Sequence, residues 1–374
     1  MKILIIPDKF KGSLTSAEVC NAIEIGILKH FPTAKITKIP LADGGEGSLA
    51  VLEKTIHFEK IYLEVRNPLF KTITAFYGLL HNAAYIEMAS ASGLQLLSKN
   101  EQNPMLTTSY GTGEMILDAI KRGITKVNLF IGGSATNDAG IGIATALGYK
   151  FLDEQNNVLE PSGANLLKIK SIDSSNVIPF ESIIFNVLTD VTNPLFGIEG
   201  AAYFYAKQKG ANLNEIALLD SGLQNISKVI NTTFGVDVSQ IPGGAGAGGV
   251  GAGMVAFCNA KIFSGIDAIM DLLNVYCQIQ LSDYVITGEG LIDNQTLKGK
   301  LVKGVVNRCK MANKPLGIIC GNINLSAEDL TFLGSSQIKT LKVKGISKED
   351  AIENAYELLE QRAEELIRQF VDIS

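Results

Sequence analysis

The chain has 374 residues, of which 46% are hydrophobic and 19% are charged, and its formal net charge is −5. This is the composition of a globular protein with an ordinary core, and the length predicts two or three domains of roughly 150 residues each. The acidic balance argues against nucleic acid as a partner, because no basic stripe is available to neutralise phosphates. Five scattered cysteines and three separated histidines argue against a disulfide framework and a histidine or zinc centre. No apolar run reaches the ~18 residues of a membrane span, so we expect a cytoplasmic protein without a membrane partner.

The N-terminal region predicts strands that alternate with helices. Four apolar residues at 3–6 indicate a buried strand, and a capping box formed by Thr15 and Glu18 indicates the start of a helix that runs toward His30. A second strand is expected over 36–41, followed by a glycine turn and another helix. Such alternation predicts a parallel α/β sheet, whose ligands bind beyond the carboxyl ends of the strands.

Charged side chains are expected at these strand ends. The polar residues that follow the first two strands are Asp8, Lys9, Lys11, Ser13, Asp43 and Glu46. A single lysine in such a loop is more often only solvated, and a single aspartate can cap a helix. Two lysines directly after a buried strand nevertheless favour a site for an anionic ligand.

The middle of the chain has a different pattern. The β-rich segments 71–80 and 83–89 lie close together and predict a hairpin, whereas the strands expected around 283–296 and 315–322 return to the first pattern. We therefore predict two different α/β domains. Residues 1–65 and 267–374 would form one with a parallel, flavodoxin- or Rossmann-like sheet, and residues 66–266 would form an inserted domain with a mixed sheet. The chain would end in an amphipathic helix after Ser347.

Three segments combine glycines with small polar residues. The first contains Gly132, Gly133, Ser134 and Thr136 before an expected helix, where backbone N–H groups and the helix dipole favour a phosphate or carboxylate. The second, with Gly246, Gly248 and Gly251, matches GxGxxG only formally, because no strand precedes it and no acidic residue follows at the dinucleotide spacing. The third places Glu289 between two glycines, just before Asp293. Each loop alone is more often a tight turn, and the second could equally serve tight helix packing.

The combination of residue types points to phosphoryl transfer. Lysines and helix N-termini bind phosphate oxygens, and carboxylates hold Mg²⁺ or orient a hydroxyl nucleophile. The carboxylates in question are Asp43, Asp138, Asp190 and Asp293. No P-loop, protein-kinase signature or GxSxG elbow occurs in the sequence. The residues alone leave open a nicotinamide-dependent dehydrogenase and a non-catalytic anion-binding protein.

Six segments, in order, resemble the signature segments of the type I glycerate kinase family. They are IIPDKFKGSLTSAE, PLADGGEG, IGGSATNDAGIG, LTDVTNPLFG, PGGAGAGGVGAG and DYVITGEGLIDNQTLKGK. The resemblance implies two α/β domains, one inserted in the other, with the site in the cleft between them. It also implies ATP-dependent, Mg²⁺-assisted phosphorylation of D-glycerate. The expected acceptor is the 2-hydroxyl, which would give 2-phospho-D-glycerate and ADP, and the alternative is the 3-hydroxyl. Two departures from the family pattern are Leu291, where arginine is usual, and Ala139, where glycine is usual.

With that activity in view, residue roles can be assigned as hypotheses. Catalytic roles are expected for Lys9, Asp190, Asp43 and Asp293. Substrate binding is expected for Asp8, Lys11, Ser13, Glu46 and Asn137. Nucleotide binding is expected for Gly132, Gly133, Ser134, Thr136, Gly246, Gly248, Gly251 and Glu289, and Mg²⁺ binding for Asp190 and Asp138. The sequence leaves open the oligomeric state and which of the two domains holds ATP.

Overall fold

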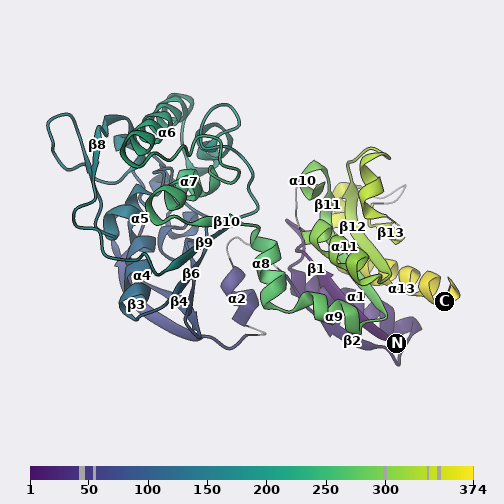
Figure 1. The fold of residues 1–374 in the computed structure, drawn as a ribbon. Helices are drawn as coiled ribbons and strands as arrows, with labels where there is room; N and C mark the ends of the chain where they lie inside the picture. Colours follow the sequence, from purple (N-terminus) through teal and green to yellow (C-terminus); the bar gives the residue numbers. More distant parts are fainter. Residues whose placement is uncertain (42–46, 54–55, 298–300, 335–336, 343–346, 374) are drawn as a thin grey trace. The chain divides into compact units, whose positions relative to one another are not determined.

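The computed structural model describes residues 1–41, 47–53, 56–297, 301–334, 337–342 and 347–373 (Figure 1). Its contacts divide the chain into two compact units. The terminal unit consists of Met1–Asp43 and Ile266–Ser374, and the inserted unit of Gly44–Gly265. The second boundary lies one residue from the predicted one, but the first lies at 43 rather than 65. The reason is that the strand over Glu59–Arg66 pairs with its neighbour in the inserted unit.

The terminal unit has a five-stranded sheet in the order β13-β12-β11-β1-β2, and every neighbouring pair is parallel. The strands are β1 (Lys2–Pro7), β2 (Lys35–Lys38), β11 (Tyr284–Ile292), β12 (Leu316–Ile323) and β13 (Gln337–Thr340). Counted along this unit, the order is 2-1-3-4-5, the flavodoxin-like arrangement. The predicted fold class is therefore confirmed, with its parallel sheet built from both ends of the chain.

Helices cover both faces of this sheet, which explains why β1 is apolar on both sides. On one face, α1 (Ser16–His30) packs against α13 (Ala355–Ile373) (Figure 1). Side chains of both helices share a core with β1. On the other face lie α9 (Val275–Leu281) and α11 (Leu301–Ala312). The remaining elements are α8 (Gly265–Leu272), α10 (Asn294–Leu297), η6 (Asp329–Leu333) and α12 (Lys348–Glu353). The predicted capping box is present, because Glu18 N donates to the Thr15 hydroxyl and Thr15 N donates to the Glu18 carboxylate.

The inserted unit has a six-stranded mixed sheet in the order β10-β9-β6-β5-β4-β3. Its strands are β3 (Glu59–Arg66), β4 (Thr72–Leu80), β5 (Ala83–Glu87), β6 (Lys126–Phe130), β9 (Ile184–Leu188) and β10 (Lys261–Phe263). The β3–β4 and β4–β5 pairs are antiparallel and the other pairs are parallel. The predicted hairpin is the β4–β5 pair. A separate two-stranded sheet pairs β7 (Lys150–Leu152) with β8 (Ser171–Asp173).

Helices complete the inserted unit around one apolar core. The helices are α2 (Ser48–Glu53), α3 (Ala89–Ser92), α4 (Tyr110–Lys121), α5 (Ile141–Ala146), α6 (Leu213–Phe234) and α7 (Gly246–Cys258). The short 3₁₀ helices are η1 (Leu94–Leu96), η2 (Lys99–Glu101), η3 (Gly163–Lys168) and η5 (Lys207–Lys209), and η4 (Ala202–Ala206) is a π-helix. Among the described helices of the whole chain, none has the length and apolar character needed to cross a membrane.

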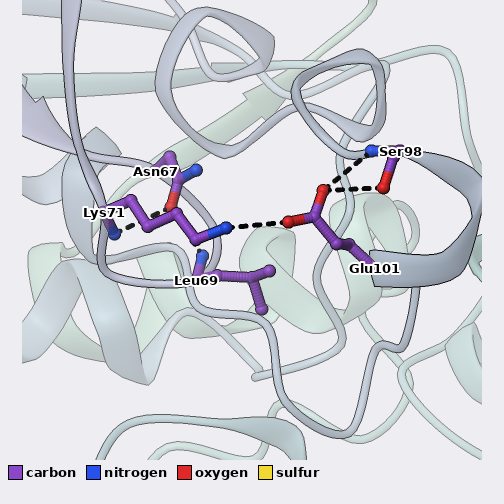
Figure 2. A network of polar contacts seen from close by, with 5 residues as sticks. All are labelled: Asn67, Leu69, Lys71, Ser98 and Glu101. Atoms are coloured by element: carbon purple, nitrogen blue, oxygen red, sulfur yellow. Dashed lines mark hydrogen bonds and ion pairs between the residues drawn. The ribbon is translucent and has the colours of Figure 1, made fainter.

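A polar network on the surface of the inserted unit ties the β3–β4 connection to η2 (Figure 2). Asn67 Oδ1 accepts hydrogen bonds from the backbone N–H groups of Leu69 and Lys71, at 2.9 and 3.0 Å. Lys71 Nζ lies 2.8 Å from Glu101 Oε1, and Glu101 Oε2 accepts from the backbone and hydroxyl of Ser98. The Lys71 and Ser98 donors lower the pKa of Glu101 to about 2. Because the pair is exposed, water screens it, and we expect it to contribute little to the stability of the fold.

Candidate active site

A pocket of about 640 Å³ lies at the carboxyl ends of the strands of the terminal unit. The loop after β1 and the end of β11 supply most of its charged side chains. Its lining residues are Asp8, Lys9, Phe10, Lys11, Ser13, Glu289, Gly290, Leu291, Asp293, Gly321, Asn322, Asn324, Leu341, Lys342, Ala351, Ile352 and Ala355. The structure thus brings together six residues predicted from the sequence for catalysis, substrate binding and nucleotide binding.

The position of this pocket follows from the strand order. β1 lies between β2 and β11, so the direction of chain progression reverses between β1 and β11. Such a switch point leaves a crevice at the carboxyl ends of the two strands, where α/β proteins bind their ligands. Asp8 N donates to Gly288 O at 2.8 Å and Thr287 Oγ1 donates to Ile6 O at 2.6 Å, which fixes the two strand ends against each other.

Local hydrogen bonds shape the loop after β1. The Asp8 side chain is buried, and its Oδ1 accepts from the backbone N–H of Lys9 at 2.7 Å. Ser13 Oγ donates to Ile352 O at 2.9 Å, which ties the loop to α12. Lys9 and Lys11 are both exposed on the same pocket. The arrangement places two ammonium groups on a loop that is anchored at both ends.

The acidic end of β11 is organised by one threonine. Thr296 Oγ1 accepts from Asp293 N at 3.1 Å and donates to Glu289 Oε1 at 2.7 Å. Thr296 N in turn donates to Asp293 Oδ1 at 3.3 Å. Glu289 is buried, whereas Leu291, which stands where the family usually has arginine, is exposed on the pocket. The pocket therefore presents two carboxylates in fixed positions and one apolar side chain from a single strand end.

The glycine loop between β6 and α5 in the inserted unit is braced by a buried lysine. Lys209 Nζ donates to Ser134 Oγ at 2.9 Å and to Thr136 O at 2.7 Å, and only 4% of Lys209 is exposed. The sequence analysis did not identify Lys209. No local sequence pattern distinguishes it, because the nearby Lys207 is also a lysine and is exposed.

Burial changes the ionisation of this lysine. Desolvation lowers the pKa of Lys209 to about 7 from its ordinary value of 10.5, and the nearby Asp138 carboxylate acts in the opposite direction. Asp138 is itself fully buried. Its pKa is raised by burial, while hydrogen bonds from Ser109, Gly140 and Gly142 oppose that rise. Lys209 and Asp138 are thus two buried ionisable groups of opposite charge beside the glycine loop between β6 and α5.

The lowered pKa of Lys209 predicts a pH dependence of stability. Between pH 7 and pH 10.5, Lys209 binds more protons in the unfolded chain than in the folded chain. The contribution of Lys209 to the free energy of unfolding therefore rises with pH. From pH 7 to pH 9 this contribution amounts to about 2 kcal/mol. Urea unfolding of the wild type and of Lys209→Met at both pH values tests it. The wild type should gain stability relative to the variant, and equal pH dependence of the two proteins would contradict the prediction.

Asp138, predicted as a Mg²⁺ ligand, has a structural role in the described geometry. Its Oδ2 accepts from Ser109 N and Ser109 Oγ, both at 2.7 Å, and from Gly142 N at 3.3 Å. Its Oδ1 accepts from Gly140 N at 3.1 Å. These bonds join the start of α4 to the start of α5 and occupy the carboxylate. We therefore do not retain Asp138 in the proposed metal site.

Asn137, predicted to bind substrate, is fully buried beside this loop. Neither its Nδ2 nor its Oδ1 has a hydrogen-bond partner within the described part of the chain. A buried amide without partners costs free energy, and such a group usually has a ligand or an ordered water to satisfy it. This observation supports the prediction that Asn137 contacts a ligand.

The glycine-rich run at the start of α7 packs against the same loop. A Cβ at Gly248 would lie 2.1 Å from Thr136 O, and a Cβ at Gly251 would lie 2.3 Å from Gly243 O. A Cβ at Gly246 would lie 2.5 Å from Ile131 Cδ1. The chain's own atoms thus fill the space that these glycines leave. The alternative of tight packing explains this segment, and the GxGxxG match does not describe a dinucleotide loop.

Asp190 follows β9, as predicted, and accepts a hydrogen bond from Ser264 Oγ at 2.9 Å. The side chain is half-buried. Within the described residues no group of three or more histidine, cysteine, aspartate or glutamate side chains could hold a metal ion. Mg²⁺ commonly binds one or two carboxylates together with substrate phosphates, so a single carboxylate such as Asp190 fits that mode.

The predicted residues Asp43 and Glu46 lie outside the described residues. The segment that follows them is held by Glu87 at the end of β5. Gly47 N donates to Glu87 Oε1 at 2.7 Å, and Leu49 N donates to Glu87 Oε2 at 3.3 Å. A carboxylate at this position satisfies the backbone donors that begin α2.

These features define a class: an α/β enzyme whose parallel sheet carries a charged pocket at its switch point and whose inserted unit carries a braced glycine loop. The sequence matches the model of the glycerate kinase family over residues 3–371, and the chain belongs to this family. The resemblance noted from the six segments is thereby confirmed, and the chain is a kinase enzyme rather than a dehydrogenase or a non-catalytic binding protein.

Known relatives cover most of the chain. A glycerate kinase of Halalkalibacterium halodurans is 39% identical over 364 residues, 96% of each chain. A glycerate 2-kinase of Escherichia coli strain K12 is 41% identical over 326 residues, 86% of each chain. A crystal structure from Salmonella typhimurium LT2, described as a glycerate kinase 2, matches with a TM-score of 0.80 and 39% identity. That match covers 100% of this chain and 98% of the other.

Proposed function

We propose that the protein transfers the γ-phosphoryl group of ATP to the 2-hydroxyl of D-glycerate, giving 2-phospho-D-glycerate and ADP. The observation that carries the choice of hydroxyl is the similarity to the E. coli glycerate 2-kinase at 41% identity. The pocket at the switch point, with its exposed lysines, supports an anionic ligand. Phosphorylation at the 3-hydroxyl is the alternative outcome.

Lysines of the terminal unit have the chemistry to bind the anionic oxygens. Lys9 and Lys11 would neutralise phosphoryl or carboxylate charge, and loss of one charge-assisted hydrogen bond costs about 1.5–3 kcal/mol. The carboxylates of Glu289 and Asp293, fixed by Thr296, would orient hydroxyl groups.

The reacting hydroxyl needs a proton acceptor. Its oxygen forms a bond to the γ-phosphorus while the bond from phosphorus to the bridging oxygen of ADP breaks, and the hydroxyl proton passes to a carboxylate. We assign that role to Asp190, with Asp43 and Asp293 as alternatives. Bound Mg²⁺ would neutralise charge on the phosphate oxygens. The loop Gly132–Thr136, braced by Lys209, and the unpartnered amide of Asn137 would hold the remaining anionic and hydroxyl groups.

Phosphorus NMR of the product tests this proposal. The protein is incubated with D-glycerate, ATP and MgCl₂, and the coupling of the new phosphate ester is recorded. A phosphate on the 2-hydroxyl couples to the single proton on C2 and gives a doublet, whereas one on the 3-hydroxyl couples to two protons and gives a triplet. We expect a doublet that does not form when ATP is omitted. A triplet would establish the 3-hydroxyl, and no ester signal would refute the kinase activity.

A further inference from the structure

We propose that the pocket of the terminal unit is the nucleotide site, with the base against the exposed apolar side chains of Leu291 and Ile352 and the phosphates toward Lys9 and Lys11. This inference rests on the proposed use of ATP. The roles expected from the sequence divide the nucleotide-binding residues between the two domains and leave open which domain holds ATP, and the inference answers that question.

The first reason is that the pocket lining has two chemically different parts. Charged side chains come from the loop after β1 and the end of β11, whereas α12 and the start of α13 supply Ala351, Ile352 and Ala355. Ile352 is 40% exposed and Leu291 is 42% exposed, although both are large apolar side chains. A flat apolar ligand would remove this surface from water, which is favourable in proportion to the area covered.

The second reason is size. Glycerate has three carbons and four oxygens and presents no apolar face. A pocket of about 640 Å³ falls within the roughly 300–1,000 Å³ typical of sites for larger ligands. A nucleotide has an apolar base at one end and anionic phosphates at the other, so it matches both the volume and the divided lining.

The third reason is the position and polar chemistry of the site. Flavodoxin-like sheets bind mononucleotides at the switch point between the first and third strands, which here are β1 and β11. Asn322 and Asn324, at and beyond the end of β12, add amide donors and acceptors suited to ring nitrogens and ribose hydroxyls. Together with the two exposed lysines they supply a partner for each part of a nucleotide.

Two matched substitutions in the full chain test the inference. Ile352→Asn removes apolar surface from the pocket, and Ile25→Asn makes the same change on α1, at a residue that is also 40% exposed but does not line the pocket. Isothermal titration with MgADP should show an about tenfold weaker Kd for Ile352→Asn and a change of less than twofold for Ile25→Asn. Inorganic tripolyphosphate, which has no base, should bind both variants as it binds the wild type. The KM for glycerate at saturating ATP should stay within twofold.

An ADP Kd unchanged in Ile352→Asn would overturn the inference, and so would a tenfold rise in the glycerate KM without loss of ADP affinity. If Ile352→Asn fails to fold by circular dichroism, Leu291→Asn carries the same test from β11. The outcome is separable from that of the proposed function. A protein that makes the phosphate ester but shows no effect of the substitution refutes only the site. A protein that binds ADP with the expected effect but forms no ester refutes only the function.

Discussion

Asp190→Asn is expected to lower the rate of glycerate phosphorylation about a hundredfold without unfolding the protein. The amide keeps the size of the side chain and an oxygen that can accept from Ser264 Oγ, so the local structure should persist. It removes the negative charge that would accept the hydroxyl proton or hold Mg²⁺. Steady-state kinetics with ATP and D-glycerate measure the effect.

Asp237→Asn provides the matched control for this substitution. Asp237 is an exposed aspartate of the same unit, and its Oδ1 also accepts from a serine, here the backbone N–H of Ser239 at 2.9 Å. The Asp237→Asn variant should retain full activity.

A second pair of variants tests the terminal unit. Lys9→Ala should lose activity on the same scale as Asp190→Asn, whereas Lys35→Ala, which changes an exposed lysine of β2, should not. Activity within threefold of wild type in both Asp190→Asn and Lys9→Ala would show that the assigned roles are wrong.

Asp138→Ala is expected to lower the free energy of unfolding by about 4 kcal/mol. The substitution leaves the donors of Ser109, Gly140 and Gly142 without their acceptor in the protein interior. It also removes the carboxylate whose charge favours the protonated form of the buried Lys209. Urea unfolding followed by circular dichroism at pH 7 measures the loss.

Asp153→Ala is the control for this stability effect. Asp153 also accepts several hydrogen bonds, from Gln155 and Asn157, but it lies in an exposed loop where water can replace them. Its loss should be much smaller than that of Asp138. If the two variants unfold at the same urea concentration, the buried cluster does not stabilise the loop in the way described.

Local patterns in the sequence were enough to predict the elements that depend on neighbouring residues. The strand β1, the capping box at Thr15 and the β4–β5 hairpin each follow from apolar periodicity or capping within a few positions. The change of pattern in the middle of the chain predicted the two-unit plan, and the family resemblance agreed with it. The first unit boundary was predicted later in the chain than the structure has it. The visible change of pattern comes at Asn67, after β3, whereas β3 already pairs within the inserted sheet.

The site was less accessible to sequence reasoning because its main contacts are far apart in the chain. Lys209 reaches Ser134 and Thr136 across more than seventy positions, so nothing near Lys209 indicates that it is buried. Glycines create a different difficulty. A ligand that approaches the backbone and a second segment that packs against it both require the absence of a Cβ. The structure distinguishes them, because atoms of the chain such as Thr136 O lie against Gly248.

The pairing of β1 with β11 has a consequence for biosynthesis. Ile3 lies beside Tyr284, so the most apolar strand of the terminal unit leaves the ribosome long before the strand that will cover its edge. The inserted unit is continuous in sequence and can complete its own core during translation, whereas β1 must wait until β11 has been made. Chaperones that shield exposed strands would therefore have their longest task at the N-terminus. The pocket itself can form only after Ala355, the last of its lining residues in the sequence, has been made.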